Sequence, residues 1–204
     1  YATIGNVTRA CLWSGTALSW VDLHPASAAS SKVLSIAGTQ QAGFAQFGSA
    51  YHASFWTGSA ASRVDLHPAG AAISVAFATD GTQQGGFASI SSVYRAGIWS
   101  GTAASWTDLH PAGAEGSAVQ ALAGTQQAGY VKIAGVNHAA LWSGTAGSFV
   151  DLHPTGSTDS QVTGISGTQQ VGFAKVGTLY RAGIWSGTAA SWQDLSAFLP
   201  TGSS

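Results

Sequence analysis

Short runs of alternating apolar and small residues follow one another along the chain, and the whole pattern recurs every 43 residues. In the copy from Ser31 to Pro68 the runs are Ser31 to Ala37, Gly43 to Phe47, Tyr51 to Trp56 and Ser62 to His67. Gly-rich turns separate the runs, which is typical of antiparallel strands joined by hairpins. No segment has a helical period of useful length. The pattern predicts an all-β protein whose repeat is a four-stranded meander.

The repeat continues without insertion through four copies. The copies are 1–43, 44–86, 87–129 and 130–172, and a partial copy covers 173–204. The Trp-Ser-Gly-Thr motif and its one variant begin at Trp13, Trp56, Trp99, Trp142 and Trp185. A unit of this size cannot bury its own apolar surface and is stabilised by stacking on its neighbours. Because no linker interrupts the period, we expect a single domain over residues 1–204.

The third run of each repeat is apolar or small on both faces, so we expect sheets to cover it from both sides. Four-stranded sheets arranged about an axis form a β-propeller, and the copy number predicts five blades of 43 residues. The small residues of Ser31 to Ala37 suit the crowded centre, and Pro68 suits the outer edge. Residues 1–30 lack an inner strand, and we expect Leu199 to Ser204 to close the ring there. A parallel β-solenoid is the alternative, but it calls for shorter coils with evenly spaced turns.

The repeat also carries a recognisable motif. It reads Trp-Ser-Gly-Thr-Ala-x-Ser-Trp-x-Asp-Leu-His-Pro, then Ser-x-Val-x-x-Ile, then Gly-x-x-x-x-Gly followed by Phe or Tyr. This unit resembles the bacterial extracellular repeats of the HAF type. The resemblance implies a propeller in a secreted or surface-anchored protein, mostly without known activity. The chain departs from the motif at Ser196, which replaces the histidine. The expected blade number also resembles the five-bladed lectins of the tachylectin type, which is an analogy of fold alone.

Arginine and histidine side chains occupy two fixed positions of the repeat and are our candidate ligand-binding residues. One position begins the third strand, and the other lies in Asp-Leu-His-Pro: Arg9, His52, Arg95, His138 and Arg181; His24, His67, His110 and His153. In a meander both positions fall at the same end of the sheets, near Tyr51, Tyr94 and Tyr180. Planar donors beside aromatic rings suit sugars and small anions. Alternatively, Asp22 and His24 hydrogen-bond locally and fix the edge of the blade.

Paired glutamines form a second polar set in the Gly-Thr-Gln-Gln turns. They are Gln40 and Gln41, Gln83 and Gln84, Gln126 and Gln127, and Gln169 and Gln170. Their amides could bind sugar hydroxyls. Alternatively, one glutamine of each pair bonds the turn backbone and the other is solvated.

The composition excludes several classes of partner. Charged residues make up 7% of the chain, against about 25% in ordinary globular proteins, and the net charge is −1. We therefore expect no binding to nucleic acid or to anionic membranes. No apolar stretch approaches the roughly 20 residues that span a bilayer. Cys11 is the only cysteine, and Asp-x-His offers two ligands per repeat where zinc takes three or four, so we expect no metal or cofactor.

Catalysis finds no support in the sequence. Glu115 is the only glutamate, and the aspartates repeat identically, whereas an enzyme breaks the symmetry at one site. Neither a G-x-S-x-G elbow nor a P-loop occurs. Because the chain lacks a signal peptide and an initiator methionine and begins within a repeat, we expect a mature, processed or excised fragment.

The sequence therefore predicts a non-catalytic module, extracellular or at the cell surface, that binds glycan or another surface protein at several equivalent sites. One alternative is a self-assembling structural subunit of a surface layer, sheath or filament, which the low charge favours. Another is an engineered or reconstructed repeat propeller without a biological ligand, which the absence of insertions favours.

Overall fold

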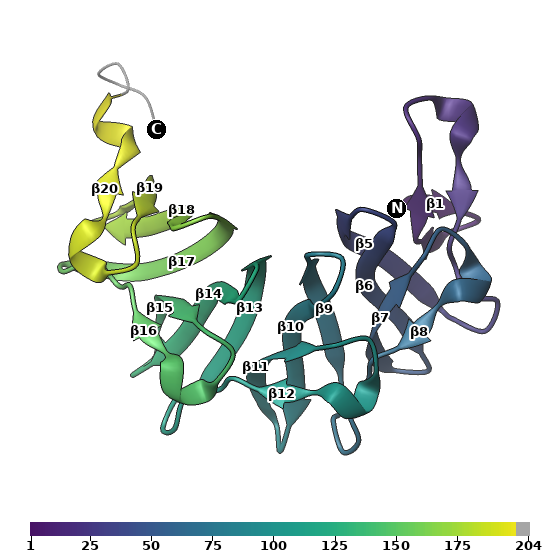
Figure 1. Cartoon of the computed structure of the whole chain (residues 1–204), viewed down its shortest axis with the longest axis horizontal. Helices are drawn as coiled ribbons and strands as arrows, with labels where there is room; N and C mark the ends of the chain where they lie inside the picture. Colours follow the sequence, from purple (N-terminus) through teal and green to yellow (C-terminus); the bar gives the residue numbers. More distant parts are fainter. Residues whose placement is uncertain (199–204) are drawn as a thin grey trace. The chain divides into compact units, whose positions relative to one another are not determined.

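The computed structural model describes residues 1–198, which form antiparallel β-sheets and short 3-10 helices, with no α-helix among them (Figure 1). Two compact units are present. The first consists of Tyr1–Val93 and Gly97–Thr107, and the second of Tyr94–Ala96 and the described residues from Asp108 onward. The prediction of an all-β protein is confirmed, whereas the prediction of one domain stays a prediction. Within residues 1–198, no helix has the length and apolar character that crossing a membrane would require.

The strands follow the repeats, which are counted from here on from the inner strand to the fourth strand, so that the first repeat ends before Ser30 and the second begins there. The first repeat holds β1 (Ala2–Ile4), β2 (Val7–Arg9), β3 (Cys11–Leu12) and β4 (Val21–Asp22). The second holds β5 (Ser30–Ala37), β6 (Gln40–Phe47), β7 (Ala50–Trp56) and β8 (Val64–Asp65). The next sheet contains residues of both units. It holds β9 (Ser74–Thr79), β10 (Gln84–Ile90), β11 (Val93–Trp99) and β12 (Thr107–Asp108). The last two sheets hold β13 (Gly116–Ala123), β14 (Gln126–Ile133), β15 (Val136–Trp142) and β16 (Val150–Asp151), then β17 (Ser157–Ser166), β18 (Gln169–Val176), β19 (Leu179–Trp185) and β20 (Gln193–Asp194).

Each of the four complete sheets has the strand order that the sequence predicts. The strands pair in chain order, so that β5 and β8 lie at opposite edges of their sheet. A bulge between Val33 and Ser35 breaks the register of β5 with β6. Opposite it, a Cβ on Gly43 would lie 1.9 Å from the backbone oxygen of Lys32, so this position requires glycine. The hairpin turn is Gly38-Thr39, with Gly38 at a φ of 55°, and Gln40 and Gln41 belong to β6 rather than to the turn.

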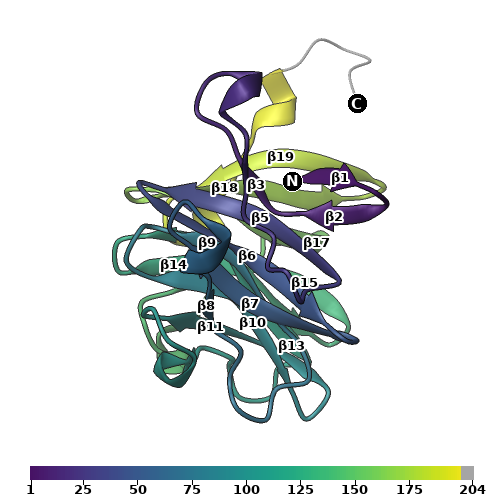
Figure 2. The same ribbon diagram turned by 90° about the vertical axis from the view of Figure 1, so that its right-hand side faces the viewer.

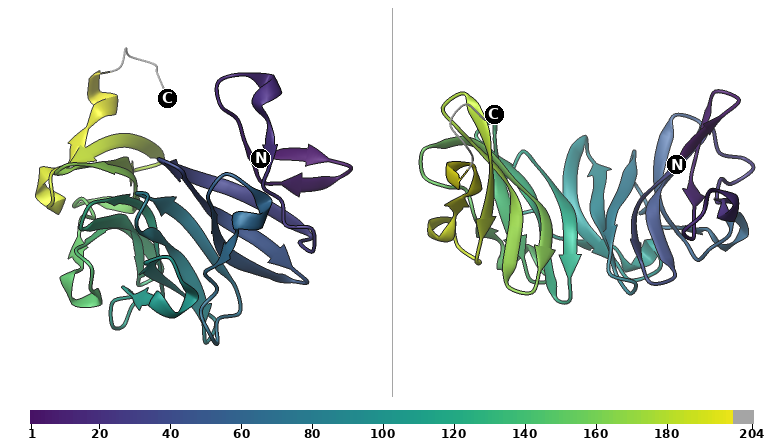
Figure 3. Two further views of the ribbon diagram at one scale, coloured as in Figure 1. Left: turned by 45° about the vertical axis from the view of Figure 1, so that its right-hand side comes forward. Right: turned by 90° about the horizontal axis from the view of Figure 1, so that it is seen from above.

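The fourth strand is shorter than predicted. It covers Val64–Asp65 rather than Ser62 to His67, and a 3-10 helix, η2 (Ala60–Ser62), precedes it. The hydroxyl of Ser62 accepts a hydrogen bond from the Thr57 N–H and donates one to the Ser59 oxygen, which closes this turn. The strand ends because the Asp65 carboxylate accepts the His67 N–H and turns the chain. Figure 3 shows the same turn in the other sheets, as η1 (Ala17–Ser19), η3 (Ala103–Ser105), η4 (Ala146–Ser148) and η5 (Ala189–Ser191); η6 (Leu195–Phe198) follows β20.

One tryptophan per repeat fills the space between successive sheets. Trp56, Trp99, Trp142 and Trp185 are fully buried, as the sequence predicts. Trp56 packs against Ala10 and Leu23 of the preceding repeat. In the second unit, the Trp185 indole N–H donates to the Leu152 oxygen at 2.8 Å. Within the two units, Trp56, Trp99 and Trp185 thus each join their repeat to the one before it.

A second packing position explains the lone cysteine. Cys11 is buried, and its repeat equivalents include Gly97 and Gly183. A Cβ on Gly97 would lie 2.2 Å from the Trp106 ring, and one on Gly183 would lie 2.0 Å from the Trp192 ring. This position of the repeat is therefore tightly packed.

The first repeat is incomplete in the way that the sequence predicts. It has no inner strand, and its remaining strands form two separate two-stranded ladders, β1–β2 and β3–β4. Figure 2 shows the β1–β2 hairpin beside β5. The predicted clasp from Leu199 to Ser204 lies outside the described residues and stays a prediction.

Candidate functional site

Every repeat pairs a basic side chain of the third strand with the aspartate of the fourth. The local reason is strand geometry: Cys11 lies opposite Asp22 in the ladder, and Arg9, two residues before Cys11, shares its face. We call the five couples the Arg/His–Asp pairs; they are Arg9–Asp22, His52–Asp65, Arg95–Asp108, His138–Asp151 and Arg181–Asp194.

The pairs have similar geometry and are partly exposed. The Arg95 Nε donates to Asp108 at 2.6 Å, and Arg181 Nη1 donates to Asp194 at 2.8 Å. In the repeats with histidine, His52 Nδ1 lies 3.0 Å from its Asp65 oxygen. The basic side chains are 20–34% exposed, and the carboxylates 20–43%. Each pair therefore presents donors and an acceptor side by side to solvent.

The second oxygen of each aspartate holds the chain that follows. Asp22 Oδ1 accepts the His24 N–H at 2.9 Å, and Asp194 Oδ1 accepts the Ser196 N–H at 2.8 Å. Burial alone would raise the pKa of Asp22, but hydrogen bonds from Arg9 and His24 hold that pKa below its usual range. These carboxylates are therefore fixed acceptors rather than mobile surface groups.

The histidines of Asp-Leu-His-Pro, here the linker histidines, form an internal network with a serine of the next inner strand. His110 Nδ1 lies 2.7 Å from Ser117 Oγ, and its Nε2 lies 3.1 Å from the Ala114 oxygen. A carbonyl oxygen only accepts, so Nε2 carries the proton and Nδ1 accepts from the serine. The serine oxygen in turn accepts the Ala96 N–H at 2.8 Å.

The same contacts recur for the other linker histidines. The Nδ1 to serine distances are 2.7 Å for His24, 2.9 Å for His67 and 2.7 Å for His153. Burial lowers the pKa of all four linker histidines. Their Nδ1 atoms accept from the serines, so these imidazoles are neutral and join the linker to the next inner strand. The local alternative paired the histidine with its aspartate, and the structure makes that contact through the backbone N–H of His24.

Where the third strand carries histidine, two imidazole rings stack. The His52 and His67 rings lie 4.0 Å apart, as do those of His138 and His153. Burial, and next the neighbouring His52 imidazole, lower the pKa of His67. The repeats therefore share one geometry: three carry a guanidinium at the pair and two carry a stacked imidazole, and in the second repeat Arg63 also lies 3.0 Å from Asp65.

The structure separates the predicted site residues into two groups. It brings Arg9, His52, Arg95, His138 and Arg181 to the partly exposed pairs, whereas His24, His67, His110 and His153 serve the internal network. The aspartates of the pairs are polar groups that the sequence interpretation placed only in local bonds. Their spacing from the basic residue, constant in every repeat, was the signal that could have found them.

The tyrosines do not join the pairs, contrary to the expectation. Tyr51 and His52 are neighbours on β7 and point to opposite faces of the sheet. Tyr51 packs edge-on against Phe44, whereas His52 contacts Phe47. Within residues 1–198, no three histidine, cysteine, aspartate or glutamate side chains gather in a way that could hold a metal ion.

The second glutamine of each pair is buried rather than solvated. Gln127 is 1% exposed; its Nε2 donates to the Thr125 oxygen at 3.1 Å and its Oε1 accepts the Gly144 N–H at 2.7 Å. Gln41, Gln84 and Gln170 accept the equivalent glycine N–H in their repeats. The backbone contact was predicted, but the burial was not, and these side chains are unavailable to a ligand.

Comparison with known proteins gives structural neighbours only. No family model and no curated protein matches the chain. A crystal structure of a puromycin hydrolase mutant complexed with PGG aligns with a TM-score of 0.67 at 14% identity, covering 87% of this chain and 30% of that one. TolB from Acinetobacter baumannii aligns with a TM-score of 0.61 at 14% identity, covering 89% of this chain and 47% of that one.

This chain thus spans less than half the length of either neighbour. At this identity the likeness concerns the fold alone. It does not extend to the HAF-type repeats or to the tachylectins, and those resemblances stay predictions. Together with the four-stranded antiparallel sheets of the repeats, the two neighbours show that the chain has a β-propeller fold.

Proposed function

We propose that this chain is a non-catalytic, extracellular binding module that takes a polyhydroxylated ligand, a glycan, at the Arg/His–Asp pairs. The observation that carries the proposal is that one partly exposed pair recurs in every repeat. A guanidinium or imidazole donor beside a carboxylate acceptor matches the donor and acceptor character of sugar hydroxyls. Weak equivalent sites gain strength when a multivalent ligand engages several of them.

The pairs differ in ways that bear on the affinity. In the first four repeats a linker histidine stands beside the aspartate, whereas Ser196 takes its place in the fifth. We expect the Arg181–Asp194 pair to bind most weakly, because no linker histidine stands beside it; Asp194 itself is held by the Ser196 N–H as the other aspartates are held by the histidine N–H groups.

A glycan array followed by titration calorimetry tests the proposal. With a sugar found on the array, we expect up to five sites per chain, one for each pair. The triple variant Arg9→Gln, Arg95→Gln and Arg181→Gln removes three donors and should leave about two sites, if the sites are independent.

The matched control removes the same charge elsewhere. The variant Lys32→Gln, Lys132→Gln and Lys175→Gln touches none of the pairs and should keep every site. A stoichiometry of one per chain, or an equal loss in the lysine variant, contradicts the proposal. If the chain bound another surface protein and no glycan, its role as a binding module would stand, but the proposed ligand class would be wrong.

The low charge supports a second candidate, a self-assembling structural subunit. With 15 charged side chains among 204 residues (7 Lys and Arg plus 8 Asp and Glu), little repulsion opposes close packing of copies. Light scattering across protein concentration distinguishes the two candidates. A particle mass that grows with protein concentration, and that is the same for the triple arginine variant, favours the structural subunit.

A further inference from the structure

One position of the repeat carries a cation in a single copy. Arg63 stands where the other repeats have an aromatic residue; the equivalents are Trp20, Trp106, Phe149 and Trp192. Two further positions of the second repeat carry residue types that no other repeat has there, Phe47 and Ser54. The other repeats have isoleucine or valine at the first of these positions and cysteine, glycine or alanine at the second. The three unusual residues occur together, in the repeat whose Arg/His–Asp pair is His52–Asp65.

The two unusual neighbours hold the Arg63 side chain in place. Its Nε donates to the Ser54 hydroxyl oxygen at 2.9 Å, and its guanidinium carbon lies 4.5 Å from the centre of the Phe47 ring. A guanidinium over an aromatic face gains a cation–π interaction. Ser54 is fully buried, and the Arg63 side chain is 15% exposed. Arg63 is therefore a fixed cation and not a freely moving surface charge.

Arg63 also contacts the pair itself. Its Nη2 lies 3.0 Å from Asp65 Oδ2, the oxygen that lies 3.0 Å from His52 Nδ1. Burial alone would raise the pKa of Asp65, but the donors of His52, His67 and Arg63 hold that pKa below its usual range. The carboxylate is thus ionised and already has three donors around it. Among residues 1–198, the polar contacts of Arg63 involve Nε and Nη2, so its Nη1 is the guanidinium nitrogen left for a ligand.

The fourth repeat shows what Arg63 adds. Both repeats have a histidine–aspartate pair with a stacked linker histidine, and Phe149 takes the place of Arg63 in the fourth. The second repeat therefore has one more positive charge beside its pair. Partly buried charges are screened less by salt than exposed ones. An anionic group that approaches Asp65 meets a compensating guanidinium, whereas one that approaches Asp151 does not.

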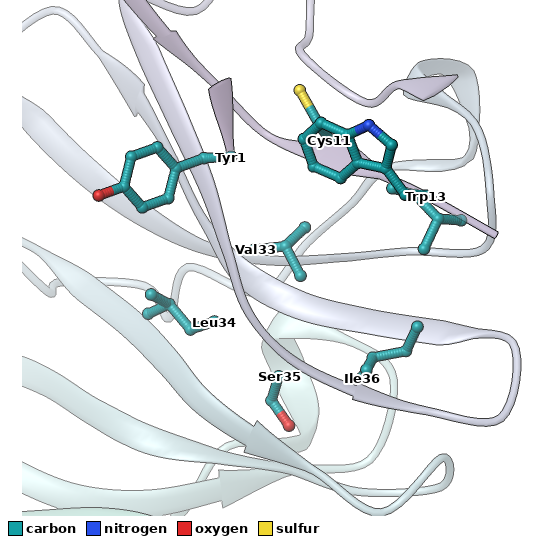
Figure 4. A pocket seen from close by; sticks show the side chains of 8 residues that line it. Tyr1, Cys11, Trp13, Val33, Leu34, Ser35 and Ile36 are labelled. Carbon is teal, nitrogen blue, oxygen red and sulfur yellow. The ribbon is translucent and has the colours of Figure 1, made fainter. Parts of the chain in front are cut away.

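Two hollows of the same compact unit offer no such group. One of about 390 Å³ is lined by apolar side chains that include Trp13, Val33 and Ile36 (Figure 4). No Lys, Arg, Asp or Glu lines it or the adjoining hollow of about 320 Å³. An anionic group buried in either would lose its hydration without gaining a charged partner. The pair beside Arg63 matches an anionic ligand better.

The geometry points to Arg63 as the residue that sets the specificity of the second repeat: this pair binds a sugar that carries a carboxylate or a sulfate in preference to a neutral sugar. Arg63 Nη1 donates to the anionic group, while the His52–Asp65 pair contacts the sugar hydroxyls as the pairs do in the other repeats. A charge-assisted hydrogen bond from a guanidinium is about twice as strong as a neutral one. This specificity rests on the proposed function, because it belongs to one of the same pairs.

Nuclear magnetic resonance titrations of the isotope-labelled full chain, at a pH where the carboxylates are ionised, test this assignment. The probes are methyl β-glucoside, methyl β-glucuronide, which has a carboxylate in place of the hydroxymethyl group, and glucose 6-sulfate. The His67 amide donates to Asp65 and reports on the second repeat, and the His153 amide donates to Asp151 and reports on the fourth. At His67, we expect an anionic sugar to bind about tenfold more tightly than the glucoside. We expect no such preference at His153. The tighter of the two anionic sugars distinguishes a uronic acid from a sulfated sugar.

Variants of the second repeat assign the preference to Arg63. Arg63→Phe combined with Ser54→Ala gives these two positions the residues of the fourth repeat and should weaken glucuronide binding at His67 about tenfold. Lys32→Gln is the matched control, because it removes one positive charge from the same repeat at a side chain that lies over the Tyr1 ring. It should keep the preference. Circular dichroism of both variants checks that the sheets are retained.

The reverse exchange builds the contacts of Arg63 into the fourth repeat. It combines Phe149→Arg with Ala140→Ser and Ile133→Phe, which are the equivalent positions. Asp159 also acts on His153, so the fourth repeat has a carboxylate that the unmodified and exchanged chains share. Compared with the unmodified chain, the exchanged chain should bind glucuronide more tightly at His153.

The assignment to Arg63 is overturned by equal binding of the three sugars at His67, or by the absence of any shift of that amide. It is also overturned if Lys32→Gln reduces the preference as much as the Arg63 variant does, or if the reverse exchange leaves glucuronide binding at His153 unchanged. The proposed function still stands after these failures if calorimetry shows several sites and the triple arginine variant removes some of them, since Arg63 is not substituted there. A failure of that calorimetry is a failure of the proposed function.

Discussion

Single side chains at repeated positions show how far local context governs this fold. Trp56, Trp99, Trp142 and Trp185 are fully buried, yet Trp13 at the same position is 43% exposed. The residue type is identical, and the difference lies in the strands that cover it. Similarly, glycine is required at Gly43 by the close carbonyl of Lys32, whereas a Cβ on Gly147 would have no neighbour within 4 Å.

Replacing a buried tryptophan should destabilise the protein strongly. Trp99→Ala leaves a cavity among Ala53, Leu66 and Ala76, and should lower the free energy of unfolding by about 3–5 kcal/mol. Urea denaturation followed by circular dichroism measures the change. Trp13→Ala is the control and should cost clearly less, since Trp13 is partly exposed; equal costs would contradict the assigned burial.

Adding one methyl group should separate the two kinds of glycine. Gly43→Ala forces the β5–β6 bulge apart and should cost about 1–3 kcal/mol or more, as overpacking does. Gly147→Ala lies in η4, in open space, and should change the free energy of unfolding by less than about 0.5 kcal/mol. Melting temperatures of the two variants decide the matter, and a tolerated Gly43→Ala would show that the backbone at the bulge can relax.

At the scale of strands and turns, buried polar side chains hold the elements together. The second glutamine of each Gly-Thr-Gln-Gln motif links the turn between the first and second strands to the turn after the third, through one amide. At the other end of the sheet, the linker histidine and its serine join the fourth strand to the next inner strand. The buried glutamines and histidines have hydrogen-bond partners within the chain, and such partners are what allows polar groups to be buried.

The two glutamines of one motif should differ sharply in their contribution to stability. Gln170→Leu leaves the Gly187 N–H without its acceptor and should cost about 1–3 kcal/mol. Gln169 is exposed, and Gln169→Leu should be nearly neutral. The comparison uses chemical denaturation of both variants, and hydrogen exchange at Gly187 should accelerate only in Gln170→Leu. Equal effects of the two substitutions on stability would contradict the role of Gln170 as the acceptor of the Gly187 N–H.

For the whole chain, the four linker histidines together make the stability depend on pH. Four linker histidines have pKa values lowered by burial from their ordinary 6.5. The unfolded chain therefore binds protons more readily than the folded one below about pH 6.5. The stability that the neutral histidines contribute is present above that pH and is lost as the pH falls through their folded values.

Mild acid should therefore lower the free energy of unfolding at pH values where the carboxylates are still ionised. The free energy of unfolding should fall between about pH 7.5 and about pH 5, a window that lies above the ordinary aspartate pKa of 3.8. Urea titrations at both pH values measure it. The variant His110→Gln should be less stable at about pH 7.5 but less sensitive to acid, since one titrating group is gone. Stability that rises on acidification would contradict the neutral assignment.

The sequence by itself determined the period, the four strands of each repeat, their order and the burial of the tryptophans. These features follow from local alternation of apolar and polar residues and from the turn chemistry, and both are repeated often enough to be unambiguous. It also indicated a local contact between Asp22 and His24, although the structure makes it through the His24 backbone N–H and not between two side chains on one strand face. The sequence did not show which side chains from other repeats and turns lie next to these residues.

Only the tertiary structure decided which polar groups face solvent. It placed the linker histidines and the second glutamines in the interior, because their partners, such as Ser117 and Gly144, come from distant turns or the next repeat. It shortened the fourth strand, since Asp65 turns the chain at its own backbone. It also left Trp13 exposed, because burial depends on which strands lie alongside a residue, and the residue's own sequence does not contain that information.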